Sequence, residues 1–157
     1  FKKTDAINFF KLNNKSFDLI LIKQTIHLLK TSEIKDLIKL CKNSLSPKGQ
    51  IFIFTLDPYK NEIPTFKKMN DKLQESLSRD KKIVNLIMDT NKSIIKNFIY
   101  KVKIKKQKYL KMVKDRYIST LLDFTLKNIQ IGCEEIKLKF KNEIKFNDKL
   151  KCIIIKK

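Results

Sequence analysis

Two short apolar segments constrain the fold of this chain more than any other feature of its sequence. Residues 17–22 read Phe-Asp-Leu-Ile-Leu-Ile and residues 51–54 read Ile-Phe-Ile-Phe, a pattern typical of parallel strands covered on both faces. Between them, apolar residues recur at helical spacing after Ser32, which can cap a helix. Ser-Pro-Lys-Gly at residues 46–49 then predicts a turn. Strand, helix, turn and strand predict one βαβ unit with a right-handed crossover.

The rest of the chain divides into a helical insert and a closing pair of strands. Residues 63–124 are rich in lysine, contain no glycine and carry apolar residues mainly at helical spacing, which predicts helices. Thr125 can start a further short helix, which Gly132 would end or interrupt. Within residues 135–156, apolar residues alternate with polar ones both before and after a polar turn at residues 142–148. This alternation predicts an antiparallel strand pair.

Composition excludes several classes of function. The two glycines of the 157 residues, Gly49 and Gly132, lie too far apart to form a G-x-G-x-x-G or Walker phosphate loop. Lys and Arg number 36 against 16 Asp and Glu, a net charge of +20. The chain's 34 Lys, 23 Ile and 12 Asn are residues that A/T-rich codons specify. We therefore attribute much of the net charge to codon bias rather than to a binding partner. One histidine and three scattered cysteines argue against a zinc site.

No targeting segment is visible in the sequence. No apolar run approaches the ~20 residues of a membrane helix, and no signal peptide is present, so we expect a cytoplasmic protein. Cys41, Cys133 and Cys152 are odd in number and lack a C-x-x-C spacing, which predicts reduced and mostly buried thiols. Since the chain begins at Phe1 and its first predicted strand starts at residue 17, we also expect that an N-terminal portion is missing.

Three local motifs accompany this order of elements. An Asp-Ala pair at residues 5–6 is followed by Asn-Asn-Lys-Ser-Phe-Asp-Leu-Ile at residues 13–20. Residues 25–29 read Thr-Ile-His-Leu-Leu, and residues 45–51 read Leu-Ser-Pro-Lys-Gly-Gln-Ile. Together they resemble the C-terminal half of a class I S-adenosylmethionine-dependent methyltransferase. The first is similar to the D-A…(D/N)-x-S-F-D-L-(I/V) segment before its fourth strand, the second to the segment after that strand, and the third to the L-x-P-G-G turn before its fifth strand.

This resemblance implies an α/β fold: the C-terminal portion of a Rossmann-like methyltransferase sheet, with a helical lid insert and a closing antiparallel strand pair. Residues 1–62 would form the central βαβ part, residues 63–124 the helical substrate lid, and residues 125–157 a C-terminal helix and β-hairpin. The family's first strand, glycine-rich loop and ribose-binding acid are absent from the sequence. We therefore expect the chain to work as part of a longer enzyme and, alone, to be inactive, with weak or no cofactor binding.

The resemblance also implies how S-adenosylmethionine would be held. A carboxylate at the Asp5 position accepts from the adenine amino group, and the backbone N–H at Ala6 meets the adenine ring. Lys23 and Gln24 leave the carboxyl end of a predicted parallel strand, where ligands of open α/β sheets gather, so they would line the cofactor. The alternatives are a solvated loop acid at Asp5 and an ordinary turn at residues 23–25. Methyl transfer from an already activated cofactor requires no metal.

Four further residues are candidates for contact with the methyl acceptor. His27 is the only histidine, and an imidazole suits a general base at neutral pH; the alternative is a structural, hydrogen-bonded histidine. Asp57 follows the second predicted strand and could orient substrate, or simply form an Asp-Pro turn. Arg116 and Tyr117 lie on a predicted amphipathic helix. The Arg116 fork suits a substrate carboxylate better than a lysine would, and plain solvation or pairing with a nearby acid is its alternative.

One lysine-rich segment suggests two other kinds of binding partner. Residues 90–114 contain nine Lys and no acid, with Phe98, Tyr100 and Tyr109 interleaved, which would suit nucleic acid or a membrane surface. Because lysine is in excess throughout and the segment has no arginine, we favour solvated lid helices. The predicted function is S-adenosylmethionine-dependent methyl transfer to a small molecule. An RNA methyltransferase and a basic, non-catalytic binding module are the alternatives.

Overall fold

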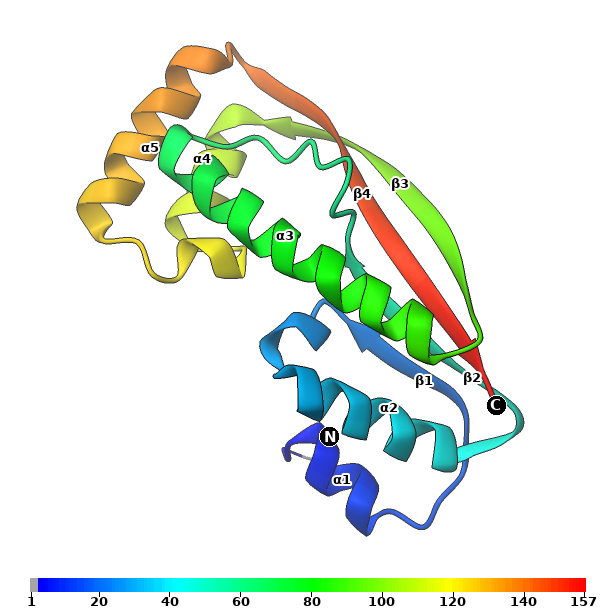
Figure 1. Ribbon diagram of the computed structural model, residues 1–157. Helices are drawn as coiled ribbons and strands as arrows, with labels where there is room; N and C mark the ends of the chain where they lie inside the picture. The colour runs from blue at the N-terminus through cyan, green and yellow to red at the C-terminus, as the bar shows by residue number, and fades with distance from the viewer. Residues whose placement is uncertain (1–2) are drawn as a thin grey trace. The chain divides into compact units, whose positions relative to one another are not determined.

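The structure is a computed structural model that describes residues 3–157 (Figure 1). The chain divides into two compact units: unit 1 is Phe1–Asp57, Arg79–Phe98 and Leu150–Lys157, and unit 2 is Pro58–Ser78 and Ile99–Lys149. The strands form a four-stranded sheet of order β1-β2-β4-β3. In chain order the elements are α1 (Ala6–Leu12), β1 (Phe17–Lys23), η1 (Ile26–Leu28), α2 (Thr31–Asn43), β2 (Leu45–Leu56), α3 (Lys67–Thr90), β3 (Ser93–Lys105), α4 (Lys106–Lys114), η2 (Ser119–Leu121), α5 (Leu126–Lys139) and β4 (Glu143–Lys156).

Unit 1 contains the predicted βαβ unit, and the α/β fold class is confirmed. β1 and β2 pair in parallel, with Leu21 opposite Phe52, and α2 connects them. A glycine is required at Gly49, because a Cβ there would lie 2.7 Å from the carbonyl oxygen of Phe17. The Ser-Pro-Lys-Gly segment at residues 46–49 lies within the bounds of β2 rather than ahead of it. The register with β1 shifts here, between Phe17 and Leu19, so the predicted turn is replaced by an irregularity of the strand.

The start of α2 differs slightly from its prediction. The N-cap is Lys30 rather than Ser32, and the carboxylate of Glu33 closes the first turn by accepting from the Lys30 N–H at 2.7 Å. The apolar stripe of α2 then joins strand residues and the second half of α3 in one buried cluster: Ile20, Ile22, Ile26, Ile34, Leu37, Ile38, Cys41, Leu45, Ile51, Ile53, Ile83, Val84, Ile87, Ile153 and Ile155.

β1 is covered on one face only, among the residues that the structure describes. Ile20 and Ile22 are buried in the cluster, but Leu19 and Leu21 are 53% and 56% exposed. Successive side chains of a strand point to opposite faces, and α2 contributes its apolar stripe to the Ile20 and Ile22 face. The prediction that residues 17–22 are covered on both faces is therefore wrong for this chain.

A strand replaces part of the predicted helical insert. β3 occupies residues 93–105, within the segment 63–124 for which the sequence pattern predicted helices. Apolar and lysine residues alternate from Tyr100 to Lys105, and this period of two belongs to a strand. The lysines of β3 are consistent with a place at the end of the strand order, since edge strands are commonly protected by charged side chains.

Helix α5 begins as predicted and continues further. The Thr125 side chain caps it by accepting from the Asn128 N–H at 3.2 Å. Gly132 does not end it, because the glycine gives room to a neighbouring ring: a Cβ at this position would lie 2.4 Å from Phe66. Ile136, expected in a strand, is instead a fully buried residue of α5.

The predicted C-terminal hairpin is consequently wrong, although its second arm is a strand. β4 runs as one long strand and pairs antiparallel with β2, with Ile153 opposite Ile53 and Ile155 opposite Ile51. β3 is its other neighbour in the sheet. The closing antiparallel element of the fold is therefore present, but its partners come from residues far earlier in the chain.

Helix α1 is an element that the sequence pattern did not predict. Asp5 caps it by accepting from the Asn8 N–H at 3.0 Å, and Ile7 and Phe10, three residues apart, pack against the core of unit 1. In residues 3–157, no helix combines the length and the apolar character that crossing a bilayer requires.

Candidate functional site

The carboxyl ends of β1 and β2 define the first candidate site. The two strands are parallel, so their carboxyl ends lie at the same edge of the sheet. The N–H of Gln24, one residue after β1, donates to the Phe54 carbonyl at 2.8 Å. Gln24 has φ of 51°, a left-handed conformation that is uncommon for a residue other than glycine and tends to occur at functional sites. Lys23 and Gln24 are both exposed.

A cavity of about 750 Å³ opens between α1 and this edge. We call it the α1 cavity. Asp5 and Ala6 line it from the start of α1, and Ile22 and Thr25 line it from the end of β1 and the residues that follow. The structure thus brings the Asp-Ala pair to the strand edge at which the other predicted cofactor residues lie. The remaining lining residues are mostly apolar: Thr4, Phe9, Phe10, Ile20, Leu21, Ile26, Leu28, Leu29 and Leu37.

Asp5, predicted to bind adenine, also forms a hydrogen bond within the protein. Its Oδ1 accepts from the Asn8 N–H, so the residue holds the first turn of α1, and the side chain is exposed. One carboxylate can accept several hydrogen bonds. Capping and ligand binding are therefore compatible at this position.

Buried polar side chains gather where β2 ends. Thr55, Asp57 and Asp80 are 3%, 7% and 6% exposed. Asp57, a predicted substrate residue, forms an ion pair of 3.8 Å with Lys151, whose ammonium also donates to Asn97 Oδ1 at 3.0 Å. A carboxylate with a partner of this kind is held in place and charge-balanced.

Asp80 on α3 lies in a different environment. The Thr55 side chain is hydrogen-bonded to its carboxylate, while Asp80 Oδ1 is buried and has no hydrogen-bond partner among the described residues. Burial raises the pKa of the Asp80 carboxyl, opposed by the charges of His27 and Arg79 and by the Thr55 hydrogen bond. His27 is half-buried on η1.

Thr55 and Asp80 are site residues that sequence reasoning missed. A signal for Asp80 exists: it occupies the spacing of the apolar residues Leu77, Val84 and Ile87 on α3. An acid at a position of the buried stripe is costly unless it has a partner or a function. For Thr55, the signal is only its place near the end of β2, two residues before Asp57, which follows the strand.

Arg116 and Tyr117 belong to unit 2 and lie in a turn after α4, so the predicted amphipathic helix through them is wrong. Arg116 has φ of 53°, and its guanidinium donates to the carbonyls of Leu122 at 3.1 Å and Phe124 at 2.7 Å. The fork that suits a carboxylate thus holds the segment around η2. A role in substrate binding stays a prediction.

The Tyr117 hydroxyl lies 2.8 Å from that of Tyr109, and Tyr109 donates to the Pro64 carbonyl at 2.7 Å. Burial is the main reason why the pKa of both hydroxyls is raised, that of Tyr117 to about 12. The pair therefore stays protonated at neutral pH and offers hydrogen bonds rather than a base.

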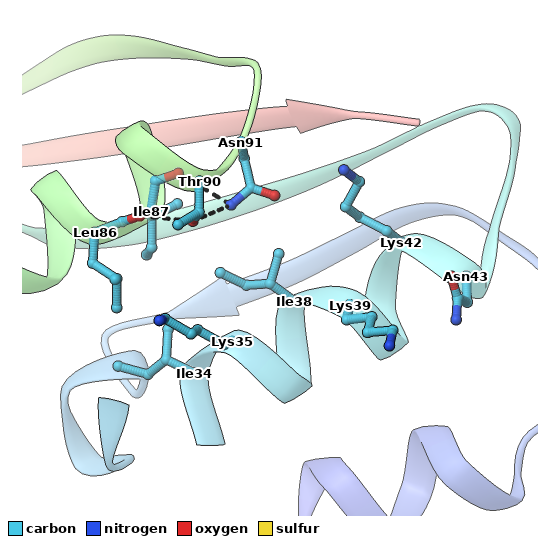
Figure 2. A pocket seen from close by; sticks show the side chains of 10 residues that line it. All are labelled: Ile34, Lys35, Ile38, Lys39, Lys42, Asn43, Leu86, Ile87, Thr90 and Asn91. Carbon is cyan, nitrogen blue, oxygen red and sulfur yellow. Dashed lines mark hydrogen bonds between the residues drawn. The ribbon is translucent and has the colours of Figure 1, made fainter. Parts of the chain in front are cut away.

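A second hollow in unit 1 contains none of the predicted site residues. Figure 2 shows it between α2 and the end of α3, with Lys35, Lys39 and Lys42 along one side and Thr90 and Asn91 opposite. The Asn91 side-chain amide donates to the Ile87 carbonyl at 3.1 Å. Of the three lysines, Lys42 lies in the last turn of α2, where a cation is favoured beside the free helix carbonyls.

The three cysteines are buried free thiols, as predicted. Burial raises the pKa of the Cys41 thiol to about 12, so at neutral pH it is protonated and a poor nucleophile. Cys41 therefore serves the core of unit 1.

Comparison with known proteins gives solved structures only. No protein-family model and no curated protein sequence matches the chain. A S-adenosylmethionine-dependent methyltransferase from Archaeoglobus fulgidus is 18% identical with a TM-score of 0.49, over 99% of this chain and 66% of that one. The plantazolicin methyltransferase BamL is 14% identical with a TM-score of 0.41, over 98% and 58%. A phosphoethanolamine N-methyltransferase of Haemonchus contortus is 14% identical with a TM-score of 0.45, over 98% and 36%. This chain thus spans less than two thirds of the length of each of these three methyltransferases.

Proposed function

We propose that this chain forms part of an S-adenosylmethionine-dependent methyltransferase that acts on a small molecule. The observation that supports this most is the α1 cavity, which joins Asp5 and Ala6 to the carboxyl end of β1. The motif resemblance assigned those same residues to the adenine of the cofactor.

The α1 cavity has the chemistry that an adenine ring needs. Its volume of about 750 Å³ is within the range of small-molecule pockets. Apolar side chains such as Phe9, Ile22 and Leu28 line it and suit the faces of the ring, while the Asp5 carboxylate suits the exocyclic amino group. In this proposal Asp5 and Ala6 hold the adenine, and Lys23 and Gln24 contact the cofactor beside them.

When bound, S-adenosylmethionine would supply an activated methyl group for in-line transfer to a nucleophile, with S-adenosylhomocysteine as the leaving group. The chain's own residues position the methyl acceptor and remove its proton. In this proposal His27 takes that proton, and Asp57, held by Lys151, orients the acceptor. Arg116 and Tyr117 are proposed as further substrate contacts.

Calorimetry tests the cofactor site directly. The protein, with any residues that its gene encodes ahead of Phe1, is titrated with S-adenosylhomocysteine, as wild type and as Asp5→Ser. Serine still caps α1 but is too short to reach the adenine, so we expect at least about tenfold weaker binding. Asp36→Asn, an exposed acid on α2, is the control. No binding by the wild type would refute the proposal and favour a non-catalytic module.

One observation favours the RNA methyltransferase alternative. In unit 2, Lys101, Lys103 and Lys145 line a hollow of about 350 Å³ beside Phe146, and Tyr100 on β3 is 72% exposed. Such lysines and aromatics suit a single RNA strand. A salt titration of RNA affinity distinguishes a specific RNA site from attraction by net charge. RNA affinity that persists at ~0.15 M salt and falls in Tyr100→Ala supports an RNA site, whereas RNA affinity that fades with salt is the effect of net charge alone.

A further inference from the structure

The hollow between α2 and the end of α3 (Figure 2) carries positive charge that no acid of its lining balances. We call it the α2–α3 hollow. Lys35, Lys39 and Lys42 line it, and among the described residues no aspartate or glutamate does. None of the three ammonium groups forms an ion pair or a hydrogen bond with another group of residues 3–157. Three unpaired cations at one concave surface favour an anionic ligand.

The lysine content of the chain does not by itself produce such a hollow. The hollow of about 350 Å³ in unit 2 also contains three lysines, but Glu62 lines it too, and Lys103 there forms an ion pair of 3.4 Å with Glu143. The α2–α3 hollow lacks such an acid, although Asp36 and Asp89 lie on the same two helices. Its charge is therefore left for a group from outside the chain.

Position near a helix end explains only one of the three lysines. Lys42 lies in the last turn of α2, but Lys35 lies in the first half of that helix, where the dipole gives a cation no advantage. The three lysines recur at spacings of four and three residues, so they share one face of α2. Like charges at these spacings destabilise a helix slightly, and a bound anion would relieve that repulsion.

The end of α3 supplies a fixed polar wall opposite the lysines. The Thr90 hydroxyl donates to the Leu86 carbonyl at 2.7 Å, and the Asn91 amide donates to Thr90 Oγ1 at 2.9 Å and to the Ile87 carbonyl at 3.1 Å. These bonds occupy helix carbonyls that would otherwise repel an anion, and they use the donors of both side chains. Asn91 Oδ1 receives no donor from the described residues. In Figure 2, Lys42 extends toward Asn91 across the hollow.

We propose that the α2–α3 hollow binds a small organic phosphate. The three lysines hold the phosphate group, since an ammonium binds phosphate as a point charge, and Asn91 Oδ1 accepts from a hydroxyl of the ligand. The half-buried side chain of Leu86 contacts the ligand's apolar part. A volume of about 380 Å³ suits one small molecule rather than a nucleic-acid strand.

This site is separate from the proposed cofactor site. The α2–α3 hollow and the α1 cavity have no lining residue in common. Asn43 lies two residues before β2 begins, whereas the α1 cavity opens at the carboxyl end of β1. The proposal therefore does not depend on methyl transfer.

NMR of the nitrogen-15-labelled protein, with any residues that its gene encodes ahead of Phe1, tests the site. The protein is titrated at ~0.15 M salt, where attraction by net charge is largely screened. The probes are inorganic pyrophosphate and uridine diphosphate, which adds hydroxyls and a ring. We expect the largest amide shifts at Asn43, Thr90 and Asn91, and at least about threefold tighter binding of uridine diphosphate than of pyrophosphate.

A pair of double variants separates this site from the general charge of the protein. Lys35→Gln with Lys42→Gln should weaken the binding of uridine diphosphate at least about tenfold, because two charge-assisted contacts are lost. Lys48→Gln with Lys156→Gln removes the same charge from two exposed strand residues of unit 1 and should leave the affinity within about twofold of the wild type.

Equal weakening in the two double variants would overturn the proposal, since it would show attraction by net charge alone. Amide shifts spread over lysines throughout the chain, or no shifts with either phosphate probe, would overturn it as well. Shifts at Asn43, Thr90 and Asn91 that only a single-stranded oligouridylate causes would refute a small-molecule site and favour RNA.

Discussion

The Thr55 side chain at the end of β2 is hydrogen-bonded to the carboxylate of Asp80 on α3, and both side chains are buried. This bond joins a strand of the sheet to a helix that covers it, at the edge where ligands of α/β sheets bind. It satisfies one oxygen of Asp80 and leaves Oδ1 without a partner among the described residues. The relationship makes a prediction about the stability of the protein.

Asp80→Asn should stabilise the protein at neutral pH. Because burial raises the pKa of Asp80 in the folded state, the folded state binds more protons than the unfolded state between the ordinary pKa of ~3.9 and the raised value. Stability is therefore lost as pH rises through that window, and the asparagine variant does not lose it. Urea unfolding at pH 4 and pH 7.5 should show a gain of roughly 1 kcal/mol that is larger at pH 7.5. A variant that is less stable at both pH values would contradict this.

Gly132→Ala should destabilise the protein although alanine favours helices. The new Cβ would lie 2.4 Å from the Phe66 ring, and forcing atoms into a packed core costs ~1–3 kcal/mol, against a helix-propensity gain of ~1 kcal/mol. The free energy of unfolding is measured in urea. Gln130→Ala, an exposed position of α5, is the control, and Phe66→Leu should partly rescue Gly132→Ala. A gain in stability would refute the packing argument.

Arg116→Lys separates a structural from a substrate role. A lysine cannot reach the carbonyls of Leu122 and Phe124 with a planar fork, so we expect a loss of ~1 kcal/mol in the free energy of unfolding. Arg79→Lys, the other arginine and an exposed one, should change little. If the stability is unchanged and only the KM of the methyl acceptor rises, the guanidinium serves substrate binding instead.

His27→Asn should lower methyl transfer at least about tenfold if His27 is the general base. Asparagine retains hydrogen bonding but cannot take a proton at neutral pH. Turnover is measured in the protein with any residues ahead of Phe1, against a panel of small hydroxyl and amine acceptors. A variant that keeps wild-type turnover would reduce His27 to a structural histidine.

The sequence pattern predicts the part of the fold that is specified locally. The apolar run at residues 17–22 and the stripe of α2 were sufficient for the βαβ unit, because buried strands and amphipathic helices have distinct periods. β3 was missed because its lysines look like a solvated helix until the alternation after Tyr100 is counted. α5 was cut short because the reason for Gly132 is the ring of Phe66, a residue distant in the sequence.

The site divides in the same way. Asp5, Ala6, Lys23 and Gln24 could be proposed because motifs and the ends of a strand are visible in the sequence, and their role in cofactor binding stays a prediction. The pairing of Asp57 with Lys151 and of Thr55 with Asp80 could not, because β4 and α3 supply the partners through tertiary packing.

Photo-crosslinking of the cofactor tests the central claim most directly. Radiolabelled S-adenosylmethionine is crosslinked by ultraviolet light to the protein with any residues ahead of Phe1, and tryptic peptides are then mapped. If the α1 cavity holds the adenine, the label appears on the peptide Thr4–Lys11, which carries Asp5, Ala6, Phe9 and Phe10, and excess S-adenosylhomocysteine removes it. Specific labelling that avoids this peptide, or no specific labelling, would contradict the account.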